Sequence, residues 1–215
     1  MNIEKIKFYN YSLPTLNKTN FKGGYKDIAG EYGRNEFDAK VNNMIKNYRR
    51  ACPFFLPEIR EVEIDGTKAK LEIYKDKYYV LTSKNNRIKA AMKVINNEDV
   101  FECNNDFYSK NNGTAEIALI YSKGHNAGKF LIKEAVKRSF DMGYGGRVSL
   151  FACTVNYDAG SPVPFYHKMG FRGTDFNTEK QIEDAIEKSK ITGLYRGPDE
   201  LNMYLDPERI NDYID

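Results

Sequence analysis

The chain has 215 residues, which is enough for one domain with a full hydrophobic core and a short appendage. Its 33 Lys and Arg residues nearly balance 30 Asp and Glu residues, and a formal charge of +3 argues against a nucleic-acid partner. Three scattered cysteines, two histidines, no signal peptide and no run of about 20 apolar residues predict a cytoplasmic protein without disulfides, metal or membrane attachment.

Residues 1–55 are predicted to form an N-terminal extension packed on the core, with a helix expected at 36–50. An apolar stripe through Phe37, Val41, Met44 and Tyr48 has helical spacing, and Pro53 follows it. The pattern then changes, because alternating and β-branched residues predict four strands at 61–65, 70–74, 78–82 and 88–95. The polar stretch 104–113 predicts a loop.

The second half alternates strands with helices. A strand is expected at 116–121, and its consecutive apolar residues predict burial on both faces. The expected helices are an amphipathic one at 128–142, a short one at 162–169 and a charged one at 179–190. Further strands are expected at 147–154, 171–175 and 201–205. Strands followed by this alternation predict an α/β fold (α+β mixed) with a mixed central sheet flanked by helices.

A glycine-bearing turn joins the strand at 116–121 to the amphipathic helix. It reads Lys123-Gly124-His125-Asn126-Ala127-Gly128. Strand, tight turn and helix N-terminus leave several N–H groups unpaired at one place, and the helix dipole adds positive potential there. This turn predicts a phosphate or pyrophosphate site, although Gly and Asn are also common in turns that only begin a helix.

A second motif lies downstream, where Tyr166-His167-Lys168-Met169-Gly170-Phe171 places a tyrosine four residues before a Gly-Phe pair. A phenol is protonated at neutral pH and can donate that proton to a leaving group. The alternative is an ordinary core aromatic. The side chains of His125 and His167 are expected to be exposed bystanders, and Cys153 is expected to be buried without acting as a nucleophile.

Both motifs, in this order, resemble those of the GCN5-related N-acetyltransferase (GNAT) family. The hexad at 123–128 resembles the family's coenzyme A loop, with Lys123 in place of Arg or Gln and Asn126 in place of a glycine. Asn156-Tyr157-Asp158-Ala159 and Tyr166 to Phe171 match two later family motifs. The resemblance covers about residues 60–206, and it implies a GNAT acetyltransferase domain over 56–215.

The resemblance implies an acetyl-CoA-dependent N-acetyltransferase, an acyltransferase in which a primary amine attacks the acetyl group directly. Tyr166 would be the general acid, and Glu116, at the head of the strand before the loop, would be a general base. Acetyl-CoA would be the co-substrate, with no metal. The residues implied for coenzyme A binding are Leu119, Ile120, Lys123, Gly124, His125, Asn126, Ala127, Gly128, Lys129 and Asn156.

Two other functions remain open. One is a non-catalytic module of GNAT fold that binds acyl-CoA or a partner, which the two departures in the hexad favour. The other is a toxin-like GNAT acting on aminoacyl-tRNA, suggested by Arg49-Arg50 and opposed by the near-neutral charge. The acceptor amine (small molecule, peptide or protein), the acyl chain and the oligomeric state are not determined by these motifs.

Overall fold

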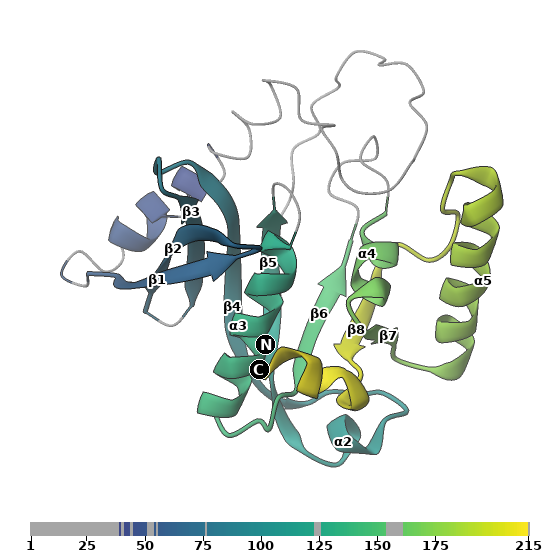
Figure 1. The fold of residues 1–215 in the computed structure, drawn as a ribbon. Helices are drawn as coiled ribbons and strands as arrows, with labels where there is room; N and C mark the ends of the chain where they lie inside the picture. Colours follow the sequence, from purple (N-terminus) through teal and green to yellow (C-terminus); the bar gives the residue numbers. More distant parts are fainter. Residues whose placement is uncertain are drawn as a thin grey trace.

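The computed structural model describes residues 39, 41–43, 45–50, 54, 56–75, 77–122, 126–153 and 161–214. These residues form one eight-stranded mixed sheet in the order β1-β2-β3-β4-β5-β6-β8-β7 (Figure 1). Strands β1 to β5 are antiparallel neighbours, β5 and β6 are parallel, and β8 pairs antiparallel with both β6 and β7. The strands are β1 Glu58–Ile64, β2 Thr67–Tyr74, β3 Tyr78–Ser83, β4 Ile88–Val100, β5 Asn112–Ser122, β6 Val148–Ala152, β7 Phe171–Gly173 and β8 Leu201–Leu205.

The helices are α2 Asp106–Ser109, α3 Ala127–Asp141, α4 Val163–Lys168, α5 Phe176–Thr192 and the 3-10 helix η2 Pro207–Tyr213. The sheet and these helices confirm the predicted mixed α/β class. In α3, the buried residues Leu131, Ile132, Ala135 and Val136 recur at the spacing of one helix face, as predicted. Among the described residues, no helix is both long and apolar enough to cross a bilayer.

Two hydrophobic clusters cover opposite faces of the sheet. The larger one contains Ile73, Leu81 and Met92, together with the buried face of α3. The smaller one contains Tyr74, Val80 and Ala91, which are the strand neighbours of those residues and therefore point to the other face. Val41 and Tyr48 pack against them. Residues 39, 41–43 and 45–50 are helical, so this part of the expected helix at 36–50 packs on the face away from α3.

Several predicted segments differ from the structure in their bounds, including those at 104–113 and 171–175. The expected loop at 104–113 contains α2, where Asn105 accepts a hydrogen bond from Phe107 N and begins the helix. The strand expected at 171–175 ends at Gly173 instead. The reason is that Asp175 caps α5 by accepting hydrogen bonds from Thr178 N and Oγ1, so the helix starts three residues earlier than expected.

The buried hydroxyl of Tyr108 on α2 fixes the start of β6. It contacts Val148 N at 3.0 Å and lies 2.8 Å from the carbonyl oxygen of Leu205. Burial is the main reason that the pKa of Tyr108 lies far above its ordinary value, so this phenol is a permanent hydrogen-bonding group. Through these two hydrogen bonds, Tyr108 links the first residue of β6 to the last residue of β8.

Candidate functional site

The parallel strands β5 and β6 are paired over three residues only. Their register joins Ala115 to Val148, Glu116 to Ser149 and Ile117 to Leu150. β5 then continues to Ser122. β6 stays paired with β8 as far as its last residue, Ala152, which lies opposite Leu201. The two arrows point apart beyond this short pairing (Figure 1). Among the described residues, β6 therefore does not pair with the part of β5 that lies beyond Ile117.

A β-bulge marks the point of divergence. β4 pairs Lys93 with Leu119 and then Val94 with Ile117, so Ala118 is the extra residue on β5. Ala118 is exposed, and Leu119, Ile120 and Tyr121 are half-buried. The prediction of burial on both faces is therefore wrong for this stretch, because β6 has moved away from it. Leu119 and Ile120 lie on the part of β5 that does not pair with β6.

Helix α3 begins directly beyond this edge. Asn126 precedes its first residue with φ of 61°, a left-handed conformation, and its carbonyl accepts the hydrogen bond of Phe130 N at 2.8 Å. This confirms that asparagine can replace the expected glycine at this turn. Ala127 and Gly128 are buried, and Lys129 is exposed on the first turn. The N-terminus of α3, whose first N–H groups have no acceptor within the helix, therefore follows the end of β5.

A carboxylate lies at the same helix terminus. Asp65, in the turn between β1 and β2, has both oxygens 2.8 Å from Asn126 Nδ2. Asp65 and Gly66 have φ of 50° and 73°, the geometry of a tight two-residue hairpin. The helix dipole stabilises a carboxylate here. The same charge repels any phosphate group that approaches these N–H groups.

Gly128 allows three elements to meet. A Cβ on Gly128 would lie 3.1 Å from Phe165 Cζ and 3.5 Å from both side-chain atoms of Ser122. The first turn of α3, the end of β5 and helix α4 thus converge on one glycine. A Cβ on Gly128 would require the Phe165 ring to shift slightly, so glycine favours this close packing whatever the helix terminus binds.

Tyr166 follows Phe165 on α4 and is half-buried. Its ring lies 5.4 Å from that of Phe165 and 5.8 Å from that of Phe171, both in edge-to-face geometry. Both neighbours, like Tyr166 itself, pack on the larger cluster beneath α3. α4 therefore carries the predicted general acid beside the divergence of β5 and β6.

Glu116 lies on the other face of the sheet. Its neighbours Ala115 and Ile117 are buried in the larger cluster, so alternation along β5 directs Glu116 away from it. Its carboxylate accepts a hydrogen bond from Asn97 Nδ2 of β4 at 3.3 Å. Tyr166 packs on the larger cluster, so the two predicted catalytic side chains, Tyr166 and Glu116, lie on opposite sides of the sheet.

The remaining predicted residues Lys123, Gly124, His125 and Asn156 lie outside the described residues. Cys153 is half-buried, and burial is the main cause that raises the pKa of its thiol, an effect opposite to the one that activates a nucleophile.

The prediction that His167 is exposed is wrong. Its side chain is 19% exposed, and Nε2 lies 2.8 Å from Glu179 Oε1 on α5. The other oxygen of Glu179 accepts the hydrogen bond of Gly173 N at 2.7 Å. Sequence reasoning missed Glu179 because one glutamate in a charged helix carries no signal of its own, and only the fold brings it beside α4.

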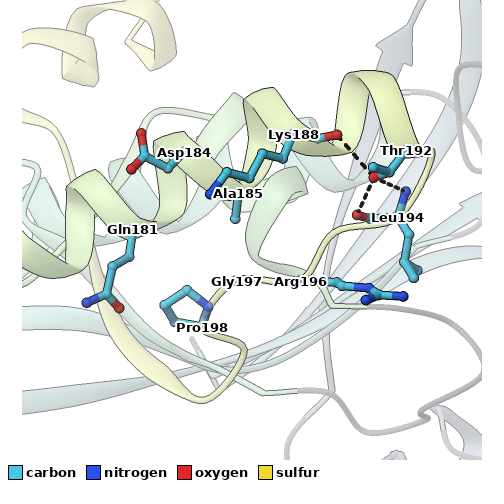
Figure 2. Close-up of a pocket in the computed structure, with 9 residues that line it drawn as sticks. All are labelled: Gln181, Asp184, Ala185, Lys188, Thr192, Leu194, Arg196, Gly197 and Pro198. Atoms are coloured by element: carbon cyan, nitrogen blue, oxygen red, sulfur yellow. Dashed lines mark hydrogen bonds between the residues drawn. The ribbon is translucent and has the colours of Figure 1, made fainter.

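A cavity of about 840 Å³ lies between α5 and the segment after it. Its lining residues, drawn in Figure 2, are Gln181, Asp184, Ala185, Lys188, Thr192, Leu194, Arg196, Gly197 and Pro198. Thr192 lies at one end, where its hydroxyl is within donating distance of the carbonyls of Lys188 and Leu194 and accepts a hydrogen bond from Leu194 N. None of the predicted catalytic or coenzyme-binding residues lines it. The lining of the cavity includes both basic and acidic side chains.

Comparison with protein-family models, with curated proteins and with solved structures gives no match for this chain. The candidate site consists of the part of β5 that β6 does not pair, the N-terminus of α3 that follows it, and helix α4, whose Phe165 lies close to Gly128.

Proposed function

We propose that this protein is an acetyl-CoA-dependent N-acetyltransferase of GNAT fold. The observation that carries the proposal is the early end of the β5–β6 pairing. β5 continues five residues beyond Ile117, with a bulge at Ala118, and leads to the N-terminus of α3. An extended amide-bearing ligand can add to such an edge as an extra strand, and its phosphates can then reach the helix terminus.

Coenzyme A has the right chemistry for this arrangement. Its pantetheine arm contains two amides, which suit the backbone N–H and C=O groups that β5 directs away from β4 near Leu119 and Ile120. Its pyrophosphate suits the first N–H groups of α3, at Ala127 and Gly128, and the exposed Lys129 adds a positive charge nearby. The strand edge fits this ligand well, whereas Asp65 weakens the fit at the phosphates.

The reaction would join an amine to the acetyl carbonyl and release coenzyme A as a thiol. Tyr166 is a proton donor that could supply the departing thiolate. Direct attack requires that the amine, the thioester and the phenol be held together, so positioning supplies much of the rate. Glu116, on the other face of β5, would act on the amine only through an intervening group.

The class of amine that accepts the acetyl group is not determined by this geometry. The cavity on α5 combines Lys188 and Arg196 with Asp184, and this mixed lining favours no single class of amine. A broad amine panel is therefore the right first screen.

One observation favours the second candidate, a non-catalytic module that binds acyl-CoA or a partner. The carboxylate of Asp65, beside Asn126, places negative charge where the pyrophosphate would lie. A protein that uses only the strand edge would bind the pantetheine arm and gain little from the phosphates.

Calorimetry with coenzyme A, acetyl-CoA and pantetheine tests the binding step, and thiol release with an amine panel tests transfer. We expect coenzyme A to bind at least tenfold more tightly than pantetheine, a difference of about 1.4 kcal/mol. Equal affinities together with no thiol release would favour the non-catalytic module. Absence of binding by all three compounds would refute the acetyltransferase and the acyl-CoA-binding module, and would leave only a module that binds a partner.

A further inference from the structure

The residue pair His167–Glu179 holds the helix that carries Tyr166. α4 has six residues, fewer than an isolated helix needs for stability, so its orientation depends on contacts with its neighbours. One such contact is the pair His167–Glu179, and His167 is the residue directly after Tyr166. A bond on this residue restrains rotation of α4 about its axis, and that rotation would move the Tyr166 hydroxyl.

Glu179 is itself firmly fixed. It lies in the first turn of α5, which Asp175 caps, and it accepts the N–H of Gly173 at the end of β7. Gly173 lacks a Cβ at a place where one would lie 3.1 Å from Glu179 N, so strand and helix touch closely. Glu179 therefore joins α4, β7 and α5 through two hydrogen bonds.

The charge around Glu179 supports a hydrogen-bonding role. Burial raises the pKa of Glu179, but the bonds from His167 and Gly173 N–H outweigh it, so the pKa lies below its ordinary value. Arg172 Nε lies 3.6 Å from Glu179 Oε1 and 3.4 Å from Asp206 Oδ2. His167, Glu179 and Glu183 have ligand atoms within 4.8 Å of one another, yet the nearby guanidinium opposes a cation.

We propose that Glu179 is a positioning residue that acts through His167 to set the orientation of Tyr166. This inference rests on the proposed acetyl transfer for its kinetic consequence but not for its structural one. A misplacement of about 1 Å can cost on the order of 10²-fold in rate. Glu179→Ala should therefore lower kcat about 10- to 100-fold and leave the affinity for acetyl-CoA within twofold. Glu179→Gln, which keeps an acceptor in place, should recover part of the loss.

The matched control is Glu183→Ala, which removes the same charge from α5 one turn further on, where the side chain is exposed. It should leave kcat unchanged. The decisive comparison is made in the Tyr166→Phe background, where Glu179→Ala should add less than a twofold loss because both changes act on one group. A full loss in that background, or an equal loss with Glu183→Ala, would overturn the proposal.

A spectroscopic measurement covers the case in which the wild-type protein transfers no acetyl group. In protein labelled with 3-fluorotyrosine, the ¹⁹F resonance missing from Tyr166→Phe belongs to Tyr166. Glu179→Ala and His167→Ala should both shift that resonance, and Glu183→Ala should not. An unshifted resonance refutes the positioning role, whatever the activity. Zn²⁺ binding that Glu179→Ala and Glu183→Ala abolish equally would also refute it, because the three residues would then be metal ligands.

Discussion

Replacing Asp65 with asparagine should tighten coenzyme A binding. The carboxylate lies 2.8 Å from Asn126 Nδ2, beside the N–H groups that would hold the pyrophosphate. Asparagine keeps the shape of the side chain and one hydrogen-bond acceptor. It also suits the left-handed conformation of residue 65 before Gly66, since Asn-Gly is a preferred pair in such hairpins. The substitution therefore removes little except the charge.

The magnitude follows from Coulomb's law. A phosphate on the first N–H groups of α3 would lie about 8 Å from Asp65, and in water such a charge pair repels by about 0.5 kcal/mol. A pyrophosphate with about two charges doubles this to about 1 kcal/mol, which is about a fivefold change in affinity. Salt of about 0.15 M has a Debye length of about 8 Å, so the gain should shrink to about twofold there.

Calorimetry with coenzyme A at low and at moderate salt measures this change. Pantetheine is the matched ligand, because it lacks the phosphates and should bind both proteins equally. Glu63→Gln, which removes an exposed charge from β1, is the matched variant and should have a smaller effect. Unchanged or weaker coenzyme A binding by Asp65→Asn would refute the placement of the pyrophosphate at α3.

Three further outcomes are expected. Tyr166→Phe should lower kcat on the order of 10²–10⁴-fold with acetyl-CoA affinity nearly unchanged, and a loss of only a few-fold in single-turnover assays would make Tyr166 a packing residue. Gly173→Ala should destabilise the fold by about 1–3 kcal/mol in urea titrations, because a Cβ would lie 3.0 Å from Thr178 Cγ2 and 3.1 Å from a backbone nitrogen. Gly193→Asn, at a left-handed position with open space, should cost well under half as much. The lowered pKa of Glu179 means that its stabilising contribution is complete above its ordinary value of 4.5 and is lost as pH falls through the folded-state pKa. The unfolding free energy of the wild type should therefore drop more steeply than that of Glu179→Gln between about pH 5 and pH 3, and parallel curves would contradict the shift.

Local patterns determined most of the elements. The apolar spacing of Leu131, Ile132, Ala135 and Val136 predicted α3 and its buried face, because only helical periodicity brings these residues together. Alternation predicted the antiparallel strands, and β8 has the expected bounds. The left-handed turn before α3 was also predictable, because asparagine tolerates this conformation.

The sequence did not predict the bounds of elements whose ends depend on contacts with residues far away in the chain. β4 extends to Val100 because Asn112 of β5 pairs with it, although Asn96 and Asn97 do not resemble strand residues. α2 is held by Tyr108, whose hydroxyl reaches β6 and β8, and four residues are too few to show a period. The start of α5 depended on the cap Asp175, which resembles a loop residue in isolation.

The sequence by itself determined the candidate residues of the site: the turn before α3, and Tyr166 four residues before Gly170-Phe171. Both motifs are local, so they can be recognised from a few consecutive residues. The tertiary structure decided that β5 leaves β6 after Ile117, that Gly128 meets Phe165, and that Asp65 and Glu179 lie beside the two motifs. Asp65 precedes Asn126 by 61 residues, and Glu179 follows His167 by 12. Contacts of that kind arise from packing of the whole chain, so no window of the sequence contains them.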